Sequence, residues 1–166
     1  MPERRYVAVC GPDPCSPEVA ARCEEVGRLL AQAGAVVVCG GLGGAMEAAA
    51  RGAADVGGVV LGILPSSNRT GANPHLTLSI PTGMGEARNT LIVRSSQALI
   101  AVAGEFGTLS EVAFALKVGV PVVGLGTWEL SKGGRRVEAF PEAASPEAAV
   151  REALRLAAAR EPAPQL

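Results

Sequence analysis

The stretch that decides the fold is YVAVCGPDPCSPEVAARCEEVGRLLAQAGAVVVCGG, residues 6–41. A short apolar run, 6–10, ends at a Gly-Pro pair and predicts a buried strand. Ser16, Pro17 and Glu18 then supply an N-cap, a first-position proline and a first-turn acid, so a helix is predicted to about residue 32. A second apolar run, 36–39, follows. Strand, helix and strand in this order indicate a parallel βαβ unit.

The same alternation continues along the chain. Further strands are predicted at 58–64, 76–80, 98–103 and 120–125, and further helices at 45–54, 86–96, 108–118 and 145–160. We expect an irregular loop at 127–144. Apolar strands that alternate with helices predict an α/β fold, a single-domain doubly wound (Rossmann-like) parallel sheet with helices on both faces. The domain is expected to span residues 1–160, with a flexible tail at 161–166.

Composition excludes several classes of function. Of 166 residues, 48% are hydrophobic, which excludes disorder, and only 3% are aromatic. With a net charge of −1, the chain has no general field to attract a polyanion, so we expect no nucleic-acid partner. No apolar run is long enough to span a bilayer, and the start does not resemble a secretory signal. We therefore expect a cytoplasmic protein with no membrane partner.

The cysteines do not predict a metal site. Cys10, Cys15, Cys23 and Cys39 have no CxxC spacing, and His75 is the single histidine. We expect no metal and reduced thiols. A redox pair between Cys10 and Cys39 is the alternative, since adjacent strands would bring them close.

Three turns are predicted at the carboxyl ends of the strands, where such sheets bind ligands. They are residues 11–16, 40–44 and 104–108. Glycines let the backbone approach a ligand, and the helices after the second and third turns present N–H groups to an anion. Tight packing of helix on strand explains the glycines at 40–41 equally well. The predicted phosphate-binding residues are Gly11, Gly40, Gly41, Gly43, Gly44, Met84, Gly104, Gly107 and Thr108.

Two charged residues are candidate catalytic groups. Arg88 opens a predicted helix, where its charge opposes the helix dipole, so it is a candidate for binding phosphate or carboxylate. The alternative is a salt bridge to Glu86 or Glu111. Glu111 follows Thr108 by three residues, a spacing that predicts a capping box. Its carboxylate either completes that cap or faces the ligand.

The run from Ser95 to Glu111, with Arg88 upstream, resembles the signature of the lysine decarboxylase-like Rossmann family. Its LONELY GUY-type members are cytokinin-activating phosphoribohydrolases, whose pattern is an Arg-Lys pair followed by PGGxGTxxE. The turn GGLGGAM, residues 40–46, resembles the GGxxGLM turn of that family. The resemblance covers the chain to about residue 125.

The chain departs from this pattern at four positions. Ala103 replaces the proline, Glu105 the second glycine, Asn89 the lysine, and Gln97 an aspartate. Glu105 would weaken phosphate binding if it faced the ligand. These departures resemble the branch that includes the molybdenum cofactor carrier proteins, which bind a pterin phosphate.

The leading hypothesis is a protein that binds a small phosphorylated ligand, a nucleotide or a pterin phosphate. In its enzyme form it hydrolyses the N-glycosidic bond of nucleoside 5′-monophosphates, with Arg88 and Glu111 as catalytic residues. In the alternative, it is a non-catalytic carrier with a molybdopterin-type cofactor as cargo. The predicted helix at 86–96 is apolar on more than one side, which predicts core burial or a contact in a homodimer or higher homo-oligomer.

Overall fold

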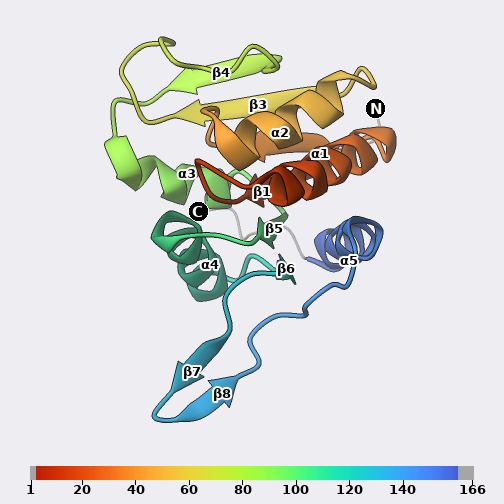
Figure 1. Ribbon diagram of the computed structural model, residues 1–166, viewed down its shortest axis with the longest axis vertical. Coiled ribbons are helices and arrows are strands. Elements are labelled where there is room, and N and C mark those ends of the chain that lie inside the picture. Colours follow the sequence, from red (N-terminus) through yellow and green to blue (C-terminus); the bar gives the residue numbers. More distant parts are fainter. Residues whose placement is uncertain (1–2, 161–166) are drawn as a thin grey trace.

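The computed structural model describes residues 3–160, and the tail expected at 161–166 lies outside them. Six parallel strands form one sheet in the order β4-β3-β2-β1-β5-β6 (Figure 1). They are β1 (Tyr6–Cys10), β2 (Val36–Cys39), β3 (Val59–Leu64), β4 (Leu78–Pro81), β5 (Ala98–Val102) and β6 (Val122–Leu125). The order reverses between β1 and β5, where the two halves of a doubly wound sheet meet. The predicted fold class is confirmed.

Helices cover both faces of this sheet. One buried cluster joins it to α1 (Pro17–Gln32), α2 (Gly44–Ala54) and α5 (Pro146–Ala159). The other joins it to α3 (Asn89–Arg94), which follows the 3-10 helix η1 (Gly85–Arg88), and to α4 (Phe106–Val118). Central strand residues such as Val37 and Ile100 are fully buried because both faces are covered.

Capping residues set where α1 and α5 begin, as predicted. The hydroxyl of Ser16 accepts a hydrogen bond from the N–H of Val19, and that of Ser145 accepts one from Ala148. Each is followed by proline at the first helical position. Gly34, with φ of 80°, lies just past the end of α1.

The segment predicted as one helix at 86–96 is divided into η1 and α3. Ile92 and Val93 are buried in the core beneath the sheet, while Leu91 is half-buried. Core burial therefore accounts for most of the apolar character of this helix. The homo-oligomer stays a prediction.

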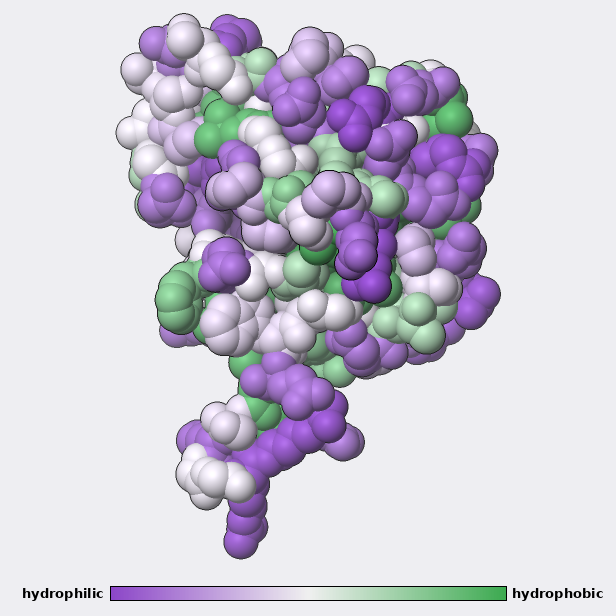
Figure 2. All heavy atoms as spheres, in the orientation of Figure 1, coloured by the Kyte–Doolittle hydropathy of each residue, from purple (hydrophilic) through white to green (hydrophobic). Residues whose placement is uncertain are grey.

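The loop predicted at 127–144 contains a β-hairpin, so its assignment as irregular was wrong. Strands β7 (Leu130–Lys132) and β8 (Arg135–Val137) pair in antiparallel fashion and project from the body of the molecule (Figure 1). Gly133 and Gly134 have φ of 58° and 76°, which a two-residue hairpin turn of the primed type requires. Polar strands without an apolar alternation do not predict such a hairpin, and Figure 2 shows it as a hydrophilic projection.

Two further expectations can be compared with the structure. The four cysteines are free thiols, so Cys10 and Cys39 are not disulfide-bonded although they end neighbouring strands. Within residues 3–160, no helix combines the length and the apolar character needed to cross a bilayer.

Candidate functional site

One hollow lies at the amino ends of the strands and another at their carboxyl ends, and the two differ in their surroundings. The larger hollow, about 870 Å³, lies at the amino ends of the strands, beside Tyr6 and Val59. In a parallel α/β fold the helices end at that edge, so their N–H groups point away from it. A smaller polar pocket of about 260 Å³ lies at the carboxyl ends, where the helices begin. We place the candidate site in this polar pocket.

Four segments of the chain meet in the polar pocket: the end of β1, the turn after β2, the η1–α3 junction and the first turns of α4. Its polar lining consists of Cys10, Asp13, Glu86, Arg88, Asn89, Glu105, Thr108 and Glu111. Among the residues that the structure describes, Arg88 is the one basic residue of this lining, beside four carboxyl groups. An anion bound here would therefore depend on Arg88 and on backbone N–H groups.

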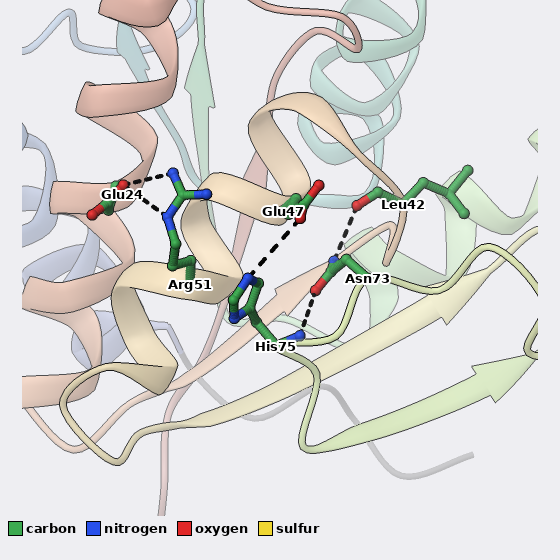
Figure 3. Close-up of polar contacts among 6 residues, drawn as sticks. All are labelled: Glu24, Leu42, Glu47, Arg51, Asn73 and His75. Carbon is green, nitrogen blue, oxygen red and sulfur yellow. Dashed lines mark hydrogen bonds and ion pairs between the residues drawn. The ribbon is translucent and has the colours of Figure 1, made fainter.

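Asn73 holds the glycine turn that precedes α2. Its backbone N–H donates to the carbonyl of Gly41 at 2.9 Å, and its side-chain amide donates to the carbonyl of Leu42 at 3.0 Å (Figure 3). Gly41 and Gly44, with φ of 77° and 59°, adopt the left-handed conformation that this turn requires. The loop after β3 thus fixes the position of the α2 N-terminus.

Next to these hydrogen bonds of Asn73, the imidazole of His75 lies 4.0 Å from the carboxylate of Glu47 on α2 (Figure 3). The N–H of His75 donates to the side-chain oxygen of Asn73 at 3.1 Å. Every polar atom of the Asn73 amide is therefore engaged in holding the loop against the turn and α2. His75 supports this loop on the outer side of α2 and is not part of the pocket lining.

The helix α4 begins earlier than its sequence predicts. Its N-cap is Glu105, with no side-chain capping bond, and the helix includes Phe106 and Gly107. Leu109 donates the first intrahelical hydrogen bond to the Glu105 carbonyl at 3.0 Å. The preceding N–H groups, on residues 106–108, have no partner within the helix. They belong to the helix end that borders the pocket, beside Thr108.

The predicted capping box at Thr108 and Glu111 was therefore wrong. Gly104, with φ of 122°, turns the backbone sharply after β5, so the helix starts two residues before Thr108. Glu111 then lies on the second turn, beyond the reach of a capping contact. Both side chains are buried and line the pocket instead.

Arg88 is buried at the pocket wall, with 7% of its surface exposed. One guanidinium nitrogen, Nη2, donates to the Gly40 carbonyl at 3.3 Å, and Nη1 donates to the side-chain oxygen of Asn89. The Nε atom is buried and has no partner. Within residues 3–160 no carboxylate lies at salt-bridge distance from Arg88, so the salt bridge to Glu86 or Glu111 that was the alternative interpretation is absent.

Glu111 and Cys10 form a buried pair on the pocket floor. Burial raises the pKa of Glu111 to about 7, while the neighbouring Cys10 thiol and the Arg88 guanidinium act in the opposite direction. Burial, and then the charge of Glu111, raise the pKa of the Cys10 thiol well above its ordinary value. The thiol therefore stays protonated at neutral pH, whereas the carboxyl titrates there.

The structure brings six of the predicted site residues together. Gly11, Gly40, Arg88, Gly107, Thr108 and Glu111 all line the polar pocket. Gly104 lines a neighbouring cavity. Gly41, Gly43, Gly44 and Met84 line neither of these two cavities.

The remaining predicted residues have other surroundings. A Cβ on Gly41 would lie 2.5 Å from the Leu64 side chain, and a Cβ on Gly44 would lie 2.6 Å from the Pro12 carbonyl. Both glycines allow close packing, which for Gly41 is what the alternative interpretation of the turn expected. Gly43 faces the Asp13 carboxylate, and Met84 is 44% exposed.

Sequence reasoning missed Cys10, Asp13 and Asn73. Cys10 is the last residue of β1 and Asp13 lies in the turn that follows, so the rule for strand carboxyl ends would have found both. Asn73 gave no such signal, because its hydrogen bonds join a loop to a turn far away in the sequence.

Known proteins resemble this chain over most of its length. The model of the SLOG cluster4 family matches residues 4–153. A protein of Archaeoglobus fulgidus is 44% identical over 137 residues, which are 82% of this chain and 90% of that protein.

Two solved structures are similar in fold and in sequence. The molybdenum cofactor binding protein of the phototrophic bacterium Rippkaea orientalis has a TM-score of 0.82 and 33% identity, covering 92% of this chain and 96% of that one. The Moco carrier protein of Chlamydomonas reinhardtii has a TM-score of 0.82 and 30% identity, covering 95% and 100%.

Proposed function

Because this chain belongs to the SLOG cluster4 family, within the lysine decarboxylase-like superfamily, we propose that its polar pocket binds a small phosphorylated ligand without catalysis. The cargo of this binding or carrier protein is a pterin phosphate of the molybdenum-cofactor type. The observation that carries the proposal is the buried Nε of Arg88, which has no partner among residues 3–160.

A buried guanidinium donor without an acceptor is costly, because it has lost water and gained nothing in exchange. The other two nitrogens of Arg88 are bonded to Gly40 and Asn89, so the group is held in one orientation. A phosphate oxygen would satisfy Nε and compensate the positive charge. Arg88 therefore has the features of a preorganised anion ligand.

Two helices contribute to the same pocket. The turn before α2 and the first turn of α4 both line it, through Gly40 and Gly107. The N–H groups at the start of α4 that have no partner within the helix, and the positive end of its dipole, favour an anion there. Thr108 adds a buried hydroxyl, with 3% of its surface exposed. These groups would hold the phosphate of the cargo.

Acidic residues around the pocket favour a carrier of moderate affinity. They argue against an enzyme and against a tight binder. Asp13, Glu86 and Glu105 line it with exposed carboxylates, which oppose a phosphate and weaken its binding. A carrier has to release its cargo, so moderate affinity suits this role. The resemblance to proteins described as binding or carrying the molybdenum cofactor supports the same assignment.

One observation favours a second function, hydrolysis of nucleoside 5′-monophosphates. Glu111 has a pKa of about 7 at the pocket floor, a value that suits a general acid or base at neutral pH. In this version Arg88 steadies the ribose or the phosphate. Glu111 would stabilise the positive charge that develops as the N-glycosidic bond breaks, or orient the attacking water.

Calorimetric titration with a pterin phosphate and with a panel of nucleoside 5′-monophosphates tests the proposal. We expect binding by the native protein and a loss of about tenfold or more in Arg88→Met, since charged hydrogen bonds are lost. Arg155→Met is the matched control, because Arg155 lies on α5 and pairs with Glu152. Absence of binding in the native protein, or equal loss in the control, would overturn the proposal.

Release of free base, followed in the same samples by chromatography, decides between the two functions. No release from any nucleotide supports the carrier. Release that disappears in Glu111→Ala would show a phosphoribohydrolase and would overturn the non-catalytic assignment.

A further inference from the structure

We infer that Trp128 and Phe106 form a stacking face for a flat heteroaromatic ring carried by the phosphorylated ligand of the polar pocket. This inference rests on the proposed function and adds to it a second subsite with a defined chemical preference. Three features of this subsite support the inference: the position of the two rings, their accessibility to solvent and the connection of Trp128 to the polar pocket.

The two aromatic side chains come from different elements. Phe106 is the first residue of α4, and Trp128 follows the end of β6. Their ring centroids are 5.6 Å apart with an angle of 35° between the planes. The indole N–H of Trp128 donates to the Glu105 carbonyl at 3.3 Å. The indole is thereby held against the start of the helix that lines the polar pocket.

Neither ring of this pair is buried in the core, since Trp128 is half-buried and Phe106 is exposed. Phe106 is 76% exposed, whereas Phe114 and Phe140 are partly buried against a core cluster. The chain has three phenylalanines, one tyrosine and one tryptophan, so two of five aromatic residues meet at this one edge. Aromatic faces kept in solvent beside a pocket are suited to stacking on a ligand.

A second cavity connects Trp128 to the polar pocket, while Phe106 packs against the indole from outside that cavity. The cavity measures about 540 Å³ and is lined by Trp128, by Gly104 and by Cys15 among others. Pro12 and Glu105 line both this cavity and the polar pocket, so the two meet at a shared rim. A ligand with its phosphate at Arg88 can therefore extend across the rim to the indole.

The chemistry of the two cavities defines the ligand class. One offers a guanidinium and helix N-termini, which bind phosphate. The other offers an indole face, which stacks on a planar ring whatever its hydrogen-bond pattern. The combination fits a phosphate joined by a short linker to a purine or pterin ring. A phosphate without a ring would use only the polar pocket.

The sole tryptophan makes the test direct, because selectively excited tryptophan fluorescence reports on Trp128 alone. Native protein is titrated with guanosine 5′-monophosphate, with a pterin phosphate and with ribose 5-phosphate as the ringless partner. We expect strong quenching by the first two and little by the third. In calorimetry, Trp128→Leu should weaken the ring-bearing probes about tenfold and leave ribose 5-phosphate unchanged.

Trp128→Tyr should restore most of the affinity for the ring-bearing probes, since it keeps an aromatic face. If Trp128→Leu fails to fold, the same comparison is made with Phe106→Leu, which alters an exposed side chain. Equal affinity of native protein for ribose 5-phosphate and the ring-bearing probes would overturn this inference alone. Failure of all three probes to bind would overturn the proposed function itself. A changed oligomeric mass in these variants, with unchanged affinity, would make the pair a subunit contact and also overturn the inference.

Discussion

Cys10, the last residue of β1, and Glu111 on α4 form a buried pair that lines the polar pocket, and each alters the pKa of the other. This contact joins the central strand to the helix that begins at the candidate phosphate site. Because the pair is buried, the protonation state of Glu111 is linked both to the stability of the fold and to the charge that a ligand meets.

The first prediction concerns the pH dependence of stability. Glu111 has a pKa of about 7 in the folded protein against an ordinary value of 4.5, so the folded state binds more protons than the unfolded state between these values. Stability from this group is present below about pH 4.5 and is lost as the pH rises through 7. At pH 8, Glu111→Gln should exceed the native protein in unfolding free energy by about 3 kcal/mol.

Urea unfolding at intervals from pH 5 to pH 8 measures this difference, which should shrink steadily toward the acid end. Cys10, Arg88 and Glu86 are the groups whose interactions alter the pKa of Glu111, and they are left unchanged. Glu138→Gln, at an exposed position, serves as control and should show no trend. A constant difference between native protein and Glu111→Gln would contradict the prediction.

The second prediction concerns Asn73, which should act as a positioning residue for the glycine turn. In Asn73→Asp the side chain can no longer donate to the Leu42 carbonyl, and a carboxylate faces that oxygen instead. We expect a loss of about 1–3 kcal/mol in stability and weaker binding of phosphorylated probes. Asn68→Asp is the matched control in the same loop, because Asn68 only accepts, from the N–H of Thr70. Equal effects of the two changes on stability and binding would argue against a positioning role for Asn73.

The third prediction concerns the contact between α1 and α2. A Cβ on Gly27 would lie 2.0 Å from the Ala49 carbonyl, and one on Gly52 would lie 1.9 Å from the Glu24 carbonyl. Gly27→Ala must therefore separate the two helices, at a cost larger than the gain of about 1 kcal/mol in helix propensity. We expect thermal unfolding at a temperature lower by roughly 4–8 °C, for a net loss of about 2 kcal/mol. A rise in Tm would show that the helices separate freely.

The fourth prediction separates binding from stability at Gly107. A Cβ there meets no heavy atom within 4 Å, and the residue lies in the first turn of α4 at the pocket. Gly107→Ala should leave stability unchanged or raise it by up to about 1 kcal/mol, through helix propensity. The added methyl group would occupy space needed by a phosphate, so affinity for nucleoside 5′-monophosphates should fall. Calorimetry and thermal unfolding on one preparation test both parts. Unchanged affinity would place the phosphate elsewhere.

Local chemistry explains how much of the fold could be predicted. Ser16 and Ser145 begin helices because a hydroxyl caps an N–H three residues along, a contact within one turn. The apolar strands predicted burial on both faces, and thereby the doubly wound sheet. Arg88 and Glu111 were predicted as site residues, and both line the polar pocket, as the rule for strand carboxyl ends expects.

Tertiary contacts decided what the sequence could not. The spacing of Thr108 and Glu111 is that of a capping box, yet the turn at Gly104 starts α4 earlier and turns both side chains into the pocket. Asn73, in the loop after β3, holds the glycine turn after β2 through a hydrogen bond to the Leu42 carbonyl. Phe106 meets Trp128 only because α4 and the end of β6 are neighbours. The sequence by itself determined the six strands of the sheet and the helices between them, since these follow from short-range capping and periodicity. The tertiary structure decided which side chains are buried together, because burial and its effect on the pKa of Glu111 depend on segments far apart in the chain.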